Sequence, residues 1–279
     1  VAGIPFYSAD TSSIYTHDVS GTDDTANYNT AYGIQAMDAI TTGDNNTALG
    51  YQSLSANTTG STNTAVGNES MKSNTTGASN TALGVAAMAQ NTTGTRNLAI
   101  GYQAYDASDT ENDNIAIGYQ AMTTDTAGGT RNIAVGNYAL DALTSGDDNV
   151  AVGYDAMTAN TTGGANVAVG AYALDTNSTG DNNVAVGKVA LGANTTGAGN
   201  TAVGYASLDA NTTADNNTAV GLRALSANTT GATNTAVGMN ALILNSTAEY
   251  NTAIGAYALA ATTTGSYNTA LGRSAGLAI

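Results

Sequence analysis

A glycine recurs at an almost fixed interval along nearly the whole chain. It closes fifteen copies of a five-residue motif whose most frequent form is NTAxG. The glycines are Gly33, Gly50, Gly67, Gly84, Gly101, Gly118, Gly136, Gly153, Gly170, Gly187, Gly204, Gly221, Gly238, Gly255 and Gly272. Every interval is seventeen residues except that from Gly118 to Gly136, which is eighteen. This period indicates a repeat protein, in which each unit buries its apolar side only by stacking on its neighbours.

We number the seventeen repeat positions from the asparagine of this motif. Position 1 is Asn and position 3 is Ala in all fifteen copies, while position 2 is Thr or apolar and position 4 is apolar everywhere but Tyr32. Position 8 is Ala or Ser, position 9 is mostly Leu or Met, and positions 12–15 often read Asn-Thr-Thr-Gly. The alternation over positions 2–5 predicts a β-strand. Position 9 predicts a second short strand with its large side chain inward, and the last positions predict a turn.

These patterns predict an all-β fold, a repeat β-solenoid or parallel β-roll of about fifteen 17-residue coils over residues 29–279. Residues 1–28, which hold Pro5, Phe6 and His17, are expected to form an N-terminal cap or joint. Coils stacked about 4.8 Å apart would make a rod of roughly 70 Å. Glycines at positions 5 and 15 are expected to need a positive φ. The Asn at position 1 is expected to form a ladder of side-chain amides between coils.

The oligomeric state follows from how little each coil can bury. A thin coil with few large apolar side chains gains little against the entropy of ordering its residues. We therefore expect a homotrimer. The small residues at positions 3 and 8 would form two smooth outward stripes along which chains approach one another. The alternative is that these small residues serve tight packing inside one roll.

Composition excludes several classes of function. The chain has 21 acidic against 6 basic residues and a net charge of −15, which opposes binding to nucleic acid or to an anionic membrane. No apolar run is long enough to insert into a membrane. His17 stands alone, and no nucleophile with its base is recognisable. Aspartates at positions 10 and 16 recur in alternate coils and are interpreted as a charged edge rather than a catalytic or calcium site. We expect neither an enzyme nor a cofactor.

Several copies of the motif carry a family resemblance. NVAVG at 149–153, 166–170 and 183–187, with NIAIG at 114–118, resembles the SVAIG signature of the YadA-like head repeats of trimeric autotransporter adhesins. The longer pattern NTAVGYxALxANTTGxxN is similar to repeat arrays of phage tail-fibre proteins. The resemblance spans residues 29–276, although the family repeat is usually shorter. It implies a homotrimeric, left-handed parallel β-roll on a virion or cell surface.

We therefore expect a non-enzymatic, extracellular structural and adhesive rod, part of a trimeric tail fibre or surface adhesin. Its partners would be copies of itself and a cell-surface glycan or protein receptor. Candidate surface contacts are the position-6 tyrosines Tyr51, Tyr102, Tyr119, Tyr154 and Tyr205. In a producer with N-glycosylation, acceptors on the surface turn would be Asn57, Asn74, Asn91, Asn160, Asn177, Asn194, Asn211, Asn228 and Asn245. Otherwise these asparagines are corner residues.

Two alternative functions remain open. The last repeat is incomplete, which would suit a subunit of a surface filament that polymerises end to end. Stacked threonines at positions 13 and 14 would suit a single-chain ice-binding solenoid. Adjacent residues of an extended chain point to opposite faces, so only one of these two ladders can face outward.

Overall fold

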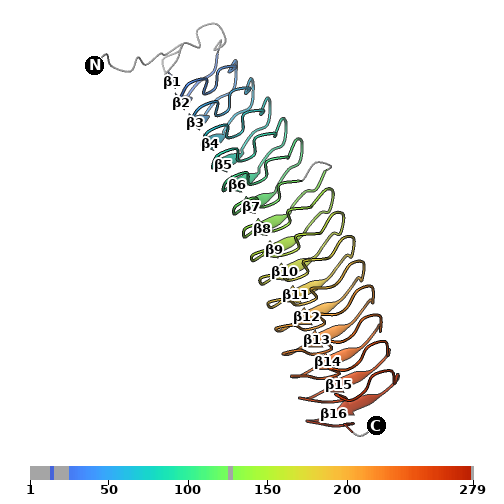
Figure 1. Ribbon diagram of the computed structural model, residues 1–279. Helices are drawn as coiled ribbons and strands as arrows, with labels where there is room; N and C mark the ends of the chain where they lie inside the picture. Colours follow the sequence, from blue (N-terminus) through green and yellow to red (C-terminus); the bar gives the residue numbers. More distant parts are fainter. Residues whose placement is uncertain (1–12, 16–24, 125–127, 278–279) are drawn as a thin grey trace, which may run out of the picture. The chain divides into compact units, whose positions relative to one another are not determined.

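The fold is all-β and built from short parallel strands. The computed structural model describes residues 13–15, 25–124 and 128–277, and the chain divides into two compact units, Val1–Asn137 and Tyr138–Ile279. The strands of each unit follow one another in chain order (Figure 1). The first unit contains β1 Ile14–Tyr15, β2 Thr30–Tyr32, β3 Thr47–Leu49, β4 Thr64–Val66, β5 Thr81–Leu83, β6 Leu98–Ile100, β7 Ile115–Ile117 and β8 Ile133–Val135. The second contains β9 Val150–Val152, β10 Val167–Val169, β11 Val184–Val186, β12 Thr201–Val203, β13 Thr218–Val220, β14 Thr235–Val237, β15 Thr252–Ile254 and β16 Thr269–Leu271.

The strand register follows the repeat. In β10 and β11, Ala168 pairs with Ala185, one repeat further on. Across the eighteen-residue interval, Ile115 of β7 still pairs with Ile133 of β8, so the extra residue is absorbed outside the strands. Both units are therefore β-solenoids, and β2–β16 delimit about 14 turns. This confirms the predicted all-β repeat solenoid, while the homotrimer stays a prediction.

Each repeat forms one strand and not two. Positions 6–11 form successive turns, in which residues at positions 7 and 9 have positive φ, as in Gln52 (54°) and Leu54 (50°). The N–H of Ser53 donates to the carbonyl of Gly50, and that of Asn57 donates to the carbonyl of Leu54 at 3.1 Å. The predicted second strand is wrong, because two tight turns replace it. The inward direction of position 9 is confirmed, since Leu54 is fully buried.

The strand faces the opposite way from the prediction. Ala168 at position 3 of β10 is fully buried, whereas Val169 at position 4 is 38% exposed. Residues at position 8 are likewise buried, as are Ser53 and Ala190. The interior of the coil is narrow, so small residues opposite the Leu or Met of position 9 fill it. The prediction that small residues form two outward stripes is therefore wrong. The alternative is correct, since these residues pack inside the roll.

The position-1 asparagines form the predicted ladder of side-chain amides, as in Asn183, whose Nδ2 donates to Oδ1 of Asn166 at 3.2 Å. A main-chain donor, which was not predicted, adds to it. The main-chain N–H of Asn183 donates to Oδ1 of Asn166 at 2.9 Å. Its own Nδ2 donates to the carbonyl of Gly197 at 2.8 Å. Each buried amide thus joins one coil to the previous coil and also closes its own coil. Ser13 takes the place of an asparagine before the first copy, since its Oγ accepts from the N–H of Asn29 at 3.1 Å.

The two frequent glycines have different physical reasons. At position 5, φ lies between 119° and 146°, which confirms the predicted positive value. At position 15 the prediction is wrong, because Gly163 has no positive φ. A Cβ on Gly163 would instead lie 2.5 Å from both Oδ1 of Asn160 and the carbonyl oxygen of Gly180. Position 15 is usually glycine because the chain passes close to its neighbours there, although Glu111, Ala214 and Ala248 occupy this position in three copies.

The segment before the first motif partly continues the stack. β1 pairs in parallel with β2, with Ile14 opposite Thr30, and Ala26 is fully buried. Pro5, Phe6 and His17 lie outside the described residues. In the described part of the chain, no helix is long and apolar enough to cross a membrane.

Candidate binding surfaces

The outward residues of the strands form a surface without charge. We call positions 2 and 4 of β9–β16 in the second unit, and of β2–β8 in the first, the strand face of each unit. No copy of the repeat has a charged residue at positions 1–5. In β9–β11 all six outward residues are valines, and in β12–β14 threonine at position 2 alternates with valine at position 4. A continuous uncharged face of this kind is typical of an interaction surface.

The position-6 tyrosines are exposed, as predicted. Tyr51 is 46% exposed and Tyr205 is 52% exposed. Tyr102 and Tyr119 stack in the first unit, with ring centroids 5.3 Å apart. In the second unit, Tyr154 makes edge contacts with two position-7 rings, one of them Tyr172 at 5.5 Å. The structure thus presents flat aromatic surfaces to solvent, while receptor contact by the five tyrosines stays a prediction.

The position-12 asparagines are inside the coil and not on a surface turn. Nδ2 of Asn194 donates to Oδ1 of Asn177 at 2.8 Å and to the carbonyl of Gly197 at 2.9 Å. The same fully buried environment holds Asn57, Asn74, Asn91, Asn160, Asn177, Asn194, Asn211, Asn228 and Asn245. The expected surface placement is therefore wrong, because a glycan would need the amide hydrogens and the space that this second ladder uses. The ladder stops where Ser108 and Thr262 replace the next asparagine.

The turn threonines divide as the prediction required. Position 13 is half-buried, and the hydroxyl of Thr195 donates to the carbonyl of Thr212 in the next coil at 3.0 Å. Position 14 is exposed, as in Thr196. Only one of the two ladders faces outward, and the hydroxyls of the other are occupied by hydrogen bonds.

The aspartate rows have local structural roles. Oδ1 of Asp181 at position 16 accepts from the main-chain N–H of Gly164, and Oδ1 of Asp215 accepts from that of Ala198, both at 2.7 Å. These carboxylates satisfy backbone groups of the preceding coil. In the part of the chain that the structure describes, no group of three or more His, Asp or Glu side chains is placed to hold a metal ion.

The position-10 aspartates give a testable pH dependence. Burial raises the pKa of Asp175; the N–H groups of Asp175 and Thr176 oppose the rise, and the charges of Asp155 and Asp209 add to it. The pKa of this carboxyl is higher in the folded than in the unfolded protein. The free energy of unfolding therefore falls as the pH rises from the unfolded-state pKa through the folded-state pKa. At pH 7 the free energy of unfolding of Asp175→Asn should therefore exceed that of the wild type. The difference should be about 0.5 kcal/mol or less, because solvent screens the carboxylate.

That difference should shrink as pH falls through about 4 and be small by about pH 3, where the carboxyl is mostly protonated in both states. Thermal melts at a series of pH values from 3 to 7 measure it, with Asp181→Asn as a control. A gain for Asp175→Asn that persists unchanged at pH 3 would contradict the assignment.

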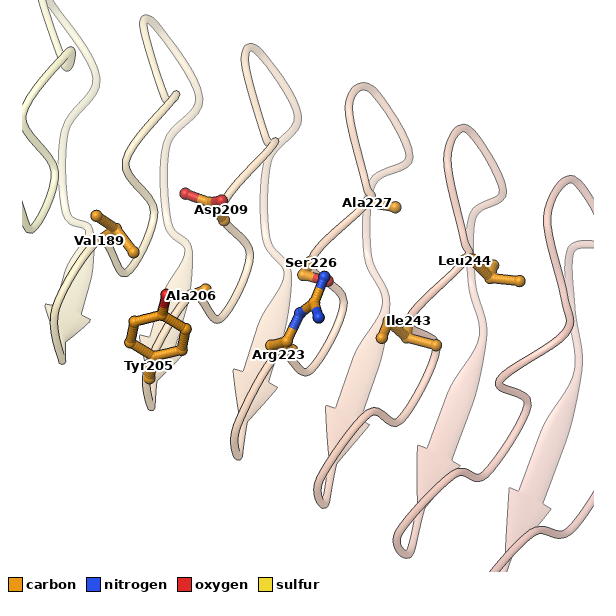
Figure 2. A pocket seen from close by; sticks show the side chains of 9 residues that line it. All are labelled: Val189, Tyr205, Ala206, Asp209, Arg223, Ser226, Ala227, Ile243 and Leu244. Atoms are coloured by element: carbon orange, nitrogen blue, oxygen red, sulfur yellow. The ribbon is translucent and has the colours of Figure 1, made fainter.

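A cavity of about 470 Å³ lies in the second unit and was not foreseen from the sequence. Figure 2 shows that its walls come from the turn segments of successive coils. Ile243 and Leu244 at positions 10 and 11 are large apolar residues where most copies have small or polar ones. This departure from the repeat is the sequence feature that could have indicated the cavity. Whether these two residues form a cavity depends on which side chains face them from neighbouring coils, and only the geometry of the turns determines that.

Comparisons with known proteins gave no match. No protein-family model, no curated protein and no solved structure is similar to this chain. The likeness to adhesin and tail-fibre repeats therefore depends on the motifs alone.

Proposed function

We propose that this protein is a non-enzymatic structural and adhesive rod that works as a homotrimer outside the cell, on a virion or cell surface. The observation that supports it is the strand face. In a monomer this face would leave rows of valine, isoleucine and leucine in water along each unit. Burying these rows against other copies of the chain stabilises the assembly by about 25 cal/mol per Å².

Charge favours the same face as the contact. The chain carries a net charge of −15, and every carboxylate of the repeats lies outside positions 1–6. Copies that meet through their strand faces keep these carboxylates apart, whereas contacts through the aspartate rows at positions 10 and 16 would bring like charges together. The number three rests on the resemblance to trimeric adhesins and tail fibres.

Adhesion would use the surfaces that remain open. The position-6 tyrosines follow the strand and stay exposed, and tyrosine is common in contacts with receptors because it offers both a ring and a hydroxyl. A surface glycan or protein is the partner that suits them. The acidic surface disfavours nucleic acid.

The trimer is tested by its mass and by a charge placed on the strand face. Light scattering coupled to size exclusion should give three times the chain mass of 27.6 kDa. Val186→Asp, at position 4 of β11, should lower this to one chain mass. The monomer should stay folded, because the outward side chain is only half-buried within its own coil.

Thr213→Asp is the matched control, because it adds the same charge to an exposed turn residue outside the strand face. This variant should remain trimeric. If the wild-type protein is a folded monomer, the proposal is contradicted. If it forms large open-ended species, the polymerising filament is favoured instead.

One observation favours a second candidate, a single-chain ice-binding solenoid. In β12–β14 the outward threonines and valines form two parallel ladders of hydroxyl and methyl groups. This is a different surface from the turn threonines on which the prediction was based. A monomeric mass together with inhibited ice growth, lost in Thr218→Glu, would support it over the trimer.

A further inference from the structure

The cavity in the second unit is a break in an otherwise regular surface. At position 7 several copies have glutamine, but the cavity has the buried Ala206 there. At position 11 most copies have a small residue, but the cavity has Leu244, which is 52% exposed. A small residue in one coil and large ones two coils away leave a hollow with an apolar wall.

Polar groups line the same hollow and are not used by the fold. Tyr205 is 52% exposed and offers a ring face with a hydroxyl. Burial raises the pKa of Asp209, and the nearby Arg223 opposes that rise. Among the described residues these two groups make no direct ion pair with one another, so the carboxylate keeps acceptor capacity and the guanidinium keeps donor capacity. Ser226 adds a hydroxyl to the lining (Figure 2).

We propose that this cavity binds a neutral saccharide, with a hexose or N-acetylhexosamine ring of an oligosaccharide as its occupant. A sugar ring has apolar C–H faces and a rim of hydroxyls that both donate and accept. Tyr205 and Leu244 offer apolar surface to the faces, and Asp209 and Arg223 offer an acceptor and a donor to the rim. One negative and one positive group leave the lining without net formal charge, which favours a neutral ligand. The volume of about 470 Å³ lies within the usual range for small ligands.

The proposal deepens the adhesive function and rests on it. None of the lining residues belongs to a strand, so the cavity stays open when strand faces are buried between chains. A trimer would then carry three equal sites on one rod. Weak binding at each site would be strengthened by simultaneous attachment to a glycan-covered surface.

Calorimetric titration of the full chain tests the proposal. The probes are maltotriose, cellotriose and chitotriose as neutral oligosaccharides, trigalacturonate as an anionic one, and a tripeptide of alanine as a non-sugar. At least one neutral oligosaccharide should bind, and trigalacturonate should bind more weakly. Tyr205→Ala should weaken binding about tenfold, as loss of a central aromatic contact does.

The repeat supplies further variants that should fold. Glutamine occupies position 7 in Gln35, Gln52, Gln103 and Gln120. Ala206→Gln should fill the cavity and abolish binding, and Arg223→Gln should weaken it by removing the charged donor. Tyr250→Ala is the control, because this tyrosine is 49% exposed, lies outside the cavity and is not one of the position-6 tyrosines. Thermal melts confirm that each variant is folded.

The outcomes separate this proposal from the rod itself. Absence of binding by every neutral probe, or binding that survives Ala206→Gln, overturns the saccharide site. Preference for trigalacturonate or for the tripeptide overturns the assignment to neutral sugars. A trimeric mass with no saccharide binding leaves the proposed rod intact and removes only this site.

Discussion

Gly204→Ala is expected to destabilise the second unit by more than about 4 kcal/mol, which is exceptional for the addition of one methyl group. Gly204 has a φ of 135°, a region that L-residues rarely adopt. A Cβ there would lie 2.5 Å from the carbonyl oxygen of Gly221 in the next coil. The strain cannot be relieved by moving one coil, because β11 and β13 hold β12 in register on both sides. Urea unfolding followed by circular dichroism measures the loss.

Hydrogen exchange shows whether the damage is local. Repeat proteins lose structure through neighbouring units, so amides of residues 184–221 should lose protection first. Gly164→Ala is the control, because Gly164 has no positive φ and Ala198 occupies the same position in another coil. This variant should unfold within about 0.5 kcal/mol of the wild type. Equal effects of the two substitutions would refute the explanation.

Much of the fold was predictable because it depends on the period alone. A fixed repeat implies equal coils, equal coils stack in parallel register, and any residue repeated at one position forms a ladder. The buried leucine or methionine at position 9 and the asparagine ladder at position 1 follow from this. So does the positive φ at position 5, where no other residue ever replaces the glycine.

The face of the strand that turns inward was not predictable in the same way. Alternation separates two faces but does not label them, and the usual assumption places larger apolar residues inside. Here the interior is so narrow that Ala168 fills it while Val167 and Val169 face outward. The missing information was the width of the coil, which depends on the two turns after each glycine. In these turns ordinary residues such as Gln52 and Leu54 have positive φ. Glutamine and leucine rarely adopt this conformation, so the residue types at these positions do not predict it.

The candidate surfaces were predictable only in part. Tyrosines that follow the strand glycine were expected to be exposed, and they are. The asparagines before Thr-Thr were expected on a surface turn, yet their short amides reach inward and bond between coils. The cavity around Tyr205 is lined by residues at positions 6, 7, 10 and 11 of four successive coils, several of which depart from the consensus. A consensus of all the repeats does not show such departures of single copies, so it does not predict the cavity.

Asn183→Ala should be the other substitution with a large effect, at about 2–4 kcal/mol. The side chain accepts from the N–H of Asn200 at 2.9 Å and donates to the carbonyl of Gly197 at 2.8 Å. All of these groups are buried. Alanine would leave the buried N–H of Asn200 without an acceptor, which costs about 1–3 kcal/mol. The Gly197 carbonyl would lose one of its two donors and keep Nδ2 of Asn194, which costs about 1 kcal/mol more. The urea midpoint and the exchange rate of the Asn200 amide report the two losses separately.

The neighbouring residue provides the control, and the chain itself suggests a partial rescue. Asn182→Ala removes an exposed asparagine at a position where Ala165 has a similar positive φ, so its effect should stay below about 0.5 kcal/mol. Asn183→Ser should recover part of the loss, because Ser13 accepts the same kind of N–H at the start of the ladder. Asn183→Asp should keep the acceptor but set a carboxylate against the Gly197 carbonyl, so it should remain destabilised. If Asn183→Asp were as stable as the wild type, the donation to Gly197 would contribute nothing, and only the acceptor half of the ladder would hold the coils together.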